Sequence, residues 1–243
     1  MVSAAPIGLL PLQGRKIYLE RFAAKHTEFL HQCFQNDEFM DLYRLSEKRD
    51  QPIEALRERL ENEEQHLPQQ LKRIEWVVFR QRTDKKTGEL TSYPIGVAAL
   101  ADYREQHRRA ELLMGIVDEN ERHQGVALEI ILLILDFAFN QINLNKMIAF
   151  IYGYNRYAHD NLMNLGYSQE GLLKQHIRSQ KNEFLDLYID SILREDFYAN
   201  KRIGRLSRRF LGWDVTQKTH EVTKLNKDKL AQMQTALRDS VQS

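Results

Sequence analysis

The stretch Glu119-Asn120-Glu121-Arg122-His123-Gln124-Gly125-Val126-Ala127-Leu128 decides the fold, because it joins a predicted strand to a predicted buried helix. Residues 111–117 are almost wholly apolar, which predicts the strand, and residues 125–139 are apolar all round a helical circumference, which predicts a core helix. The first N–H groups of such a helix have no intrahelical partner, and the helix dipole adds partial positive charge there. The turn is therefore a candidate site for a phosphate or a diphosphate.

Small residues in this turn suit that interpretation. Gly125 would let a ligand approach the backbone closely, and Ala127 leaves room two residues later. A glycine between a strand and a helix is nevertheless a common structural feature, so these residues alone leave both interpretations open.

Strand and helix patterns alternate on both sides of the turn. Strands are predicted at 16–22, 75–80, 95–100, 111–117, 146–152, 167–173 and 184–193, and helices at 26–34, 53–67, 125–139 and 158–165. We therefore expect an α/β (α+β) fold in which a mixed sheet carries helices on both faces.

Composition limits the classes of protein to which the chain belongs. The 35 Lys and Arg residues balance 34 Asp and Glu residues, so no global field draws the protein to nucleic acid or to an anionic membrane. The apolar run at 127–139 is shorter than the roughly 20 residues of a membrane span. The single cysteine, Cys33, cannot form an internal disulfide, and residues 7–12 are too short for a signal peptide. We expect a cytoplasmic protein.

The C-terminal part has a different character. Basic residues crowd 201–209, and we expect a domain over 1–198 followed by a basic linker and an amphipathic helical extension over 199–243. Leu230, Met233, Leu237 and Val241 would form one apolar face. Self-packing, a homodimer or a protein partner could cover that face, whereas the alternating charges argue against membrane insertion.

Two motifs resemble those of the GNAT superfamily of N-acetyltransferases. Arg122-x-x-Gly125-x-Ala127 resembles its acetyl-CoA signature Arg/Gln-x-x-Gly-x-Gly/Ala, and Leu165-Gly166-Tyr167-x-x-Glu170-Gly171 resembles its Leu-Gly-Phe-x-x-Glu-Gly passage. The similarity spans residues 16–197 and is closest to the branch of ribosomal-protein and spermidine N-acetyltransferases. It implies a mostly antiparallel sheet, splayed between the fourth and fifth strands, with acetyl-CoA as co-substrate.

The resemblance also implies which residues hold the coenzyme. The diphosphate would bind backbone amides at the helix start, with a counter-charge nearby, and the pantetheine arm would bind the edge of the fourth strand and an asparagine. These residues are Gln124, Gly125, Val126, Ala127, Leu128 and Arg122 for the diphosphate, and Met114, Gly115, Ile116 and Asn155 for the arm.

Acyl transfer to an amine needs a base for the amine proton and a proton for the departing thiolate. Glu111 stands where many relatives carry the basic carboxylate, although a solvent-facing glutamate, or one paired with Arg108 or Arg109, is an equal alternative. The tyrosine that many relatives place four residues before Gly166 is Leu162 in this chain.

Other side chains are candidates for the proton donor. Ala158 stands where another branch of the family has a serine, so we consider Tyr157 first and His159 second, with Tyr154 also close in sequence. A packed aromatic ring or a surface imidazole is the ordinary alternative for each. The scattered His107, His123 and His176 predict no metal site.

Three hypotheses follow. The leading one is an acetyl-CoA-dependent N-acetyltransferase acting on a primary amine of a small molecule, peptide or protein. The alternative is a non-catalytic acyl-CoA-binding or protein-interaction module with the same fold. A nucleic-acid-associated protein that uses residues 201–209 comes third, because a solvated basic face explains this stretch better.

Overall fold

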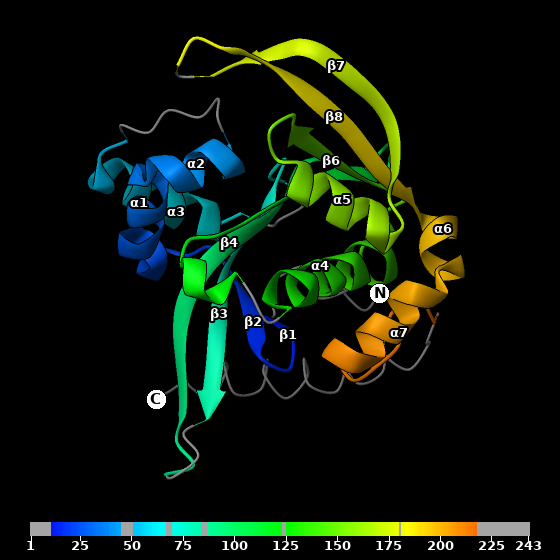
Figure 1. Ribbon diagram of the computed structural model, residues 1–243. Coiled ribbons are helices and arrows are strands. Elements are labelled where there is room, and N and C mark those ends of the chain that lie inside the picture. Colours follow the sequence, from blue (N-terminus) through cyan, green and yellow to red (C-terminus); the bar gives the residue numbers. More distant parts are fainter. Residues whose placement is uncertain are drawn as a thin grey trace.

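The computed structural model describes residues 11–44, 51–66, 70–83, 87–122, 125–179 and 181–217 (Figure 1). Within these residues eight strands form one sheet in the order β1-β2-β3-β4-β5-β6-β8-β7. The strands are β1 Leu12–Gln13, β2 Ile17–Arg21, β3 Ile74–Thr83, β4 Leu90–Arg104, β5 Arg109–Ile116, β6 Lys146–Tyr152, β7 Ser168–Arg178 and β8 Phe184–Leu193. Neighbouring strands are antiparallel except for the parallel pair β5 and β6, which confirms the mixed, mostly antiparallel sheet.

Helices cover both faces of this sheet (Figure 1). They are α1 Thr27–Gln35, α2 Asp37–Tyr43, α3 Ile53–Glu64, α4 Val126–Asp136, α5 Arg156–Leu165, α6 Arg194–Ala199 and α7 Lys201–Phe210. Helices α1, α2 and α3 lie on one face, and α4 and α5, with α7 beside α4, lie on the other. The expected arrangement of helices on both faces is confirmed.

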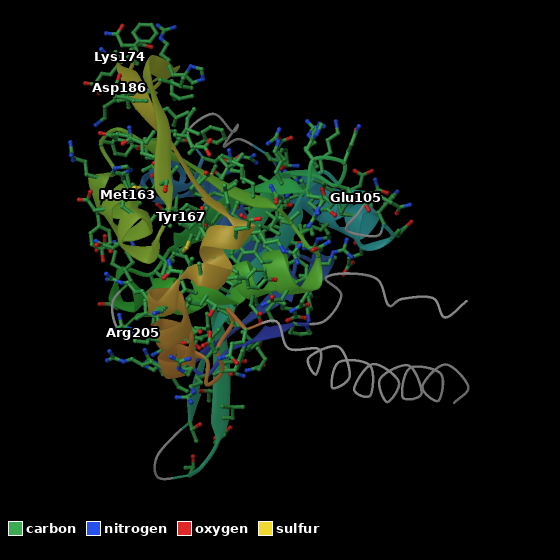
Figure 2. The ribbon with its side chains drawn as sticks, turned by 90° about the vertical axis from the view of Figure 1, so that its right-hand side faces the viewer. Glu105, Met163, Tyr167, Lys174, Asp186 and Arg205 are labelled. Carbon is green, nitrogen blue, oxygen red and sulfur yellow. The ribbon has the colours of Figure 1, made fainter. Side chains whose placement is uncertain are left out.

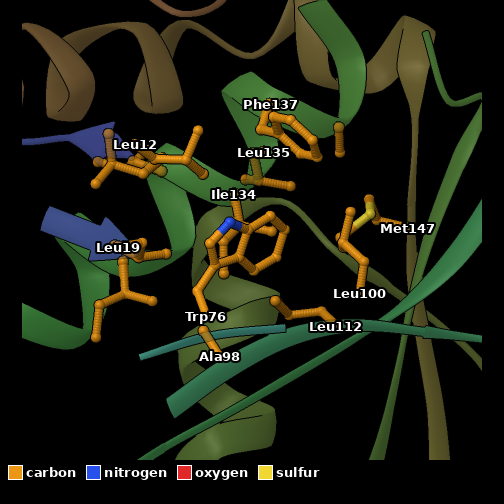
Figure 3. Packing of buried hydrophobic residues seen from close by; sticks show 14 of the residues in the cluster. Leu12, Leu19, Trp76, Ala98, Leu100, Leu112, Ile134, Leu135, Phe137 and Met147 are labelled. Atoms are coloured by element: carbon orange, nitrogen blue, oxygen red, sulfur yellow. The ribbon is translucent and has the colours of Figure 1, made fainter. Parts of the chain in front are cut away.

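Alternation along the central strands produces two hydrophobic cores. Leu112 and Ile116 of β5 pack with α4, whereas Leu113 packs with α1–α3. Trp76 of β3 is fully buried on the α4 side, where its ring meets the edge of Phe137 at 5.3 Å between centroids (Figure 3). The sheet is therefore rigid in its middle and holds α4 in a fixed place against it.

The regions between α1 and α3 and after α4 differ from the sequence prediction. Two helices are predicted between residues 26 and 67, but the structure has α2 as well, beginning at Asn36, whose side chain accepts a hydrogen bond from the N–H of Phe39 at 2.9 Å. Helix α4 is followed by one π-helical turn, Phe137–Gln141, before the chain enters β6.

The basic stretch after residue 199 is not a linker. Its residues 201–210 form α7, which is bound at both ends: the Asn200 side chain donates to the carbonyl of Leu165 at 3.0 Å, and Phe210 packs on Gly125. Ile203 is fully buried in the α4 core. The boundary at 198 thus cuts through packed structure as far as residue 217, while the predicted amphipathic helix around 230–241 lies outside the described residues.

The hairpin of β7 and β8 projects from the body of the domain, with Lys174 and Asp186 near its far end (Figures 1 and 2). Most of β7 is exposed, in contrast to β4 and β5. Among the described residues, no helix combines the length and hydrophobicity that crossing a membrane would take.

Candidate active site

A gap opens in the sheet between β5 and β6. The described pairing of these strands covers Arg109–Glu111 with Lys146–Ile148, although β5 continues to Ile116 and β6 to Tyr152. The sheet is therefore splayed at the position that the sequence resemblance implies.

Backbone groups line one side of this gap. The N–H of Val117 donates to the carbonyl of Ile95 on β4 at 2.9 Å. The backbone groups of successive residues point to alternate sides of a strand. Those of Met114 and Ile116 consequently point into the gap, whereas those of Gly115 point toward β4. Of the three strand residues predicted for the pantetheine arm, Met114 and Ile116 direct their backbone groups into the gap. Arg122 Nε already donates to the Ile116 carbonyl at 3.1 Å.

The amino end of α4 lies just beyond β5. Its first intrahelical bond runs from the N–H of Glu129 to the carbonyl of Gly125, so the N–H groups of Val126, Ala127 and Leu128 precede the hydrogen-bonded ladder. Gly125 is the N-cap and provides no capping side chain. These amides and the helix dipole can hold an anionic group at the mouth of the gap. The predicted Gln124 lies outside the described residues.

Gly125 has a structural role that the sequence did not indicate. Its φ of +78° is in the left-handed region, and an added Cβ would lie 2.3 Å from Cε1 of Phe210. The absent side chain thus makes room for the ring of Phe210 on α7.

Buried Glu121 holds the turn in front of α4 in place. It is 3% exposed, accepts a hydrogen bond from the Tyr93 hydroxyl at 2.8 Å, and forms ion pairs with Arg80 and Arg82. Burial, together with the Glu121 carboxylate, raises the pKa of Tyr93 and keeps it a donor. Nothing in the sequence singles out Glu121 for this role, because an exposed and a buried acidic residue look alike in a polar turn.

Arg122 lies between the strand end and this turn. Its Nη1 is 3.0 Å from Glu119 and its Nε donates to the Ile116 carbonyl, so the guanidinium is already oriented next to the gap. It remains a candidate counter-charge for an anion at the α4 amides.

Glu111 occupies the point where the strands begin to part. It shares the β5 face of Leu113, toward α1–α3, opposite to the face that carries α4. Its proposed surface partners bind elsewhere: Arg109 pairs with Asp102 at 3.0 Å, and Arg108 Nε donates to the Asn143 carbonyl at 2.8 Å. Burial raises the pKa of Glu111, with Asp102 adding to the rise and Arg44 opposing it. A carboxyl of this kind is suited to accept a proton near neutral pH.

His159 lies on the other side of the sheet, on the inner face of α5. It is 9% exposed, its Nδ1 is 2.8 Å from Oδ2 of the fully buried Asp190, and its ring stacks on Tyr188 at 4.3 Å between centroids. Asp190 pairs with Ala149, the first β6 residue beyond the pairing with β5. The imidazole is therefore fixed at the level where the gap opens.

Buried neighbours isolate this pair from water. Burial raises the pKa of Asp190, against the lowering by the hydrogen bond from His159. Tyr167, at the end of α5 and labelled in Figure 2, is 4% exposed, and its pKa is raised by burial and by Asp190. With an ionised Asp190, Nδ1–H donates to the carboxylate, and Nε2 is left for a ligand.

The other candidate donors are placed less favourably. Tyr157 is 79% exposed on the outer face of α5, and the Tyr154 hydroxyl donates to the carbonyl of Asp41 on α2. Leu162 is buried in the α4 core, so this position contributes packing. Asn155 caps α5 by accepting from the N–H of Ala158 at 3.2 Å, which leaves its amide nitrogen to bind a ligand.

Helix α2 closes the gap on the Glu111 face. Phe39 packs on Gly115, where an added Cβ would lie 2.4 Å from the ring. The bond from Tyr154 to Asp41 links α2 to the turn after β6. Residues of α2 thus contact β5 and the turn after β6. Within the described part of the chain no cluster of His, Cys, Asp or Glu has the arrangement of a metal site.

Known proteins resemble this chain in sequence and in fold. The family described as acetyltransferase (GNAT) domain matches residues 16–168. The uncharacterized N-acetyltransferase YoaA of Bacillus subtilis (strain 168) is 28% identical over 168 residues, which cover 68% of this chain and 87% of the relative.

Solved structures resemble the chain as well. Spermidine N-acetyltransferase from Vibrio cholerae, in complex with CoA and spermine, matches with a TM-score of 0.62 and 23% identity over 76% of this chain and 99% of that chain. A point variant of the same enzyme gives a TM-score of 0.59 at 22% identity, over 76% of this chain and 98% of that chain. At these identities the structures support the shared fold.

Proposed function

This chain belongs to the GNAT acetyltransferase family, and from that premise we propose that it transfers an acetyl group from acetyl-CoA to a primary amine of a small molecule, peptide or protein. The family makes it an acyltransferase. One observation carries the finer proposal: β5 and β6 part beside the free amides of α4, with Glu111 on the opposite face of the sheet.

The residues present fit the coenzyme on three counts. The amides of Val126, Ala127 and Leu128 can bind a diphosphate, and the edge groups of Met114 and Ile116 can pair with the amides of an extended pantetheine arm. Asn155, in the turn after β6, uses its side-chain oxygen to cap α5, and its amide nitrogen could donate to the pantetheine arm. The coenzyme supplies an activated acetyl thioester, which the gap would admit through the sheet.

Two titratable side chains on opposite faces would move the protons. Glu111 accepts a proton from the attacking amine, and His159, when protonated, donates one to the departing sulfur as the C–N bond forms and the C–S bond breaks. We propose His159 ahead of Tyr157, because the imidazole faces the sheet while the phenol lies 79% in solvent.

The acceptor would enter on the α1–α3 face, where Glu111 lies. The structural neighbours are named for spermidine, and the acidic first turn of α2, with Asp37 and Glu38, could attract a cationic amine. A cytoplasmic location and a homodimer or protein partner bound through the C-terminal extension remain part of this proposal.

Calorimetry and a thiol-release assay test the function together. We expect acetyl-CoA to bind with micromolar affinity and an amine panel that includes spermidine to yield free CoA. Absence of binding at millimolar coenzyme would overturn the proposal. Binding without turnover on any amine would favour the non-catalytic acyl-CoA-binding module, which the buried Leu162 in place of a phenol also favours.

A further inference from the structure

A cavity of about 430 Å³ lies beside the amino end of α4, between two segments far apart in sequence. Its lining comes from the β1–β2 turn, from Gly125 and from the end of α7, and consists of Arg15, Lys16, Gly125, Arg209 and Phe210. Three of these five residues are cations, and cavities of this volume hold small-molecule groups.

Direct contacts hold the two cationic segments together. Arg15 Nη1 donates to the Arg209 carbonyl at 3.2 Å, and the Arg209 guanidinium lies over the Phe210 ring at 5.5 Å. Phe210 in turn rests on Gly125. These contacts hold the side chains of Arg15 and Arg209 beside the cavity.

A carboxylate of α4 accepts hydrogen bonds from the turn that lines this cavity. Glu129 of α4 is 1% exposed, and its Oε1 accepts from the backbone N–H groups of Arg15 and Lys16 at 2.6 and 2.8 Å. It anchors the turn through its backbone N–H groups, and within the described residues it forms no ion pair with the side chains of Arg15, Lys16 or Arg209. The positive charges of Arg15, Lys16 and Arg209 are therefore available to an anion in the cavity.

We propose that this cavity binds the 3′-phosphate of the coenzyme, with Arg15, Lys16 and Arg209 as its counter-charges. The inference rests on the proposed function, because Gly125 lines the cavity and also begins the helix whose amides would hold the diphosphate. Basic side chains around a phosphate monoester form charge-assisted hydrogen bonds, to which arginine is well matched.

The site depends on a segment beyond the family match. That match ends at residue 168, whereas Arg209 and Phe210 belong to α7. Helix α7 would accordingly serve as a wall of the coenzyme site, and selectivity for the 3′-phosphate would be a property of chains that carry this helix.

Calorimetry with acetyl-CoA and 3′-dephospho-acetyl-CoA tests the proposal. We expect the full chain to bind acetyl-CoA roughly ten- to a hundredfold more tightly. Arg209→Ala and Arg15→Ala should bring the two affinities within about threefold of each other by weakening acetyl-CoA alone, and Arg209→Lys should restore part of the difference. Arg205→Ala is the matched control, since Arg205 is an exposed arginine of α7 that lines no part of this cavity (Figure 2).

Each outcome decides a different point. Equal affinities in the unmodified chain, or a preference that survives both variants with an unchanged melting temperature, would overturn the inference and leave the proposed function intact. Equal affinities together with binding of inorganic phosphate would assign the cavity to a free anion, which also overturns it. Failure of both coenzymes to bind would overturn the inference and the proposed function together.

Discussion

The two faces of the sheet around the gap are built in contrasting ways. On the coenzyme face, part-buried contacts join α7 to the ends of α4 and α5, through Phe210 on Gly125 and Asn200 on the Leu165 carbonyl. On the acceptor face, α2 meets the gap through Phe39 and through one hydrogen bond from an exposed tyrosine.

This contrast separates two demands on the molecule. A face that always binds the same large coenzyme binds it more tightly when its binding groups are held rigidly in position beforehand. A face that must admit an amine and release its product can be less firmly closed. Variants on the two faces should therefore affect different kinetic constants.

The largest effect is expected from Glu111→Gln on the acceptor face. Loss of the base should lower kcat by about 10²- to 10⁴-fold, while acetyl-CoA affinity stays within about twofold, because the side chain faces away from α4. Steady-state thiol release and calorimetry would measure the two quantities. Equal losses of binding and turnover would remove the distinction between the faces.

The pH profile sharpens this assignment. Burial raises the pKa of Glu111, and the base must be ionised, so kcat/KM should fall as pH drops through that raised pKa, above the ordinary range of a glutamate. The acid limb should disappear in Glu111→Gln. A limb that persists unchanged in the variant belongs to another group.

A smaller effect is expected from the buried pair on the coenzyme face. His159→Gln should lower kcat by roughly ten- to a hundredfold, since water can also protonate a thiolate. Asp190→Asn should lower kcat by a smaller factor, because it removes the carboxylate that orients the imidazole but leaves the ring in place.

The control for this pair is Tyr157→Phe, which alters an exposed ring on the same helix and should leave kcat unchanged. If both Tyr157→Phe and His159→Gln are harmless, the sulfur takes its proton from water. A loss confined to Tyr157→Phe would restore the phenol as the donor.

Much of the coenzyme face could be predicted from the sequence, because it depends on local signals. Gly125 before an all-apolar helix marks a helix start, and Gly166 after α5 marks a helix C-terminus with the positive φ that such an end favours. The gap itself was implied by resemblance, since no local pattern indicates where two strands stop pairing.

The remaining features depend on contacts between distant segments. Asp190 gave no signal in sequence, because an aspartate in a strand predicts exposure until a partner such as His159 is known. Helix α2 was missed since its Asn36 cap follows α1 directly. The basic composition of 201–209 hid the buried face of α7, which is made of small or isolated residues such as Gly204 and Ser207.

Gly125→Ala tests how firmly α7 is joined to the coenzyme face. A Cβ at φ +78° and 2.3 Å from Phe210 should cost about 1–3 kcal/mol of unfolding free energy, measured by denaturant titration. Adding Phe210→Ala to the Gly125→Ala variant should restore only the part of the unfolding free energy that the clash removed, because the backbone strain remains. Full recovery would mean that the left-handed conformation costs nothing.

The smallest effect is expected from Tyr154→Phe, on the acceptor face. Its hydroxyl donates to the Asp41 carbonyl and so ties α2 to the turn after β6, but the ring is 46% exposed and water can replace the bond. We expect KM for the amine to rise by about two- to fivefold, with kcat and acetyl-CoA affinity unchanged. Tyr154→Ala should raise the KM for the amine further by removing the ring. If Tyr154→Phe instead weakens acetyl-CoA binding, the two faces are mechanically coupled through this turn. Asn155, the next residue, would then transmit the change from the acceptor face to the coenzyme.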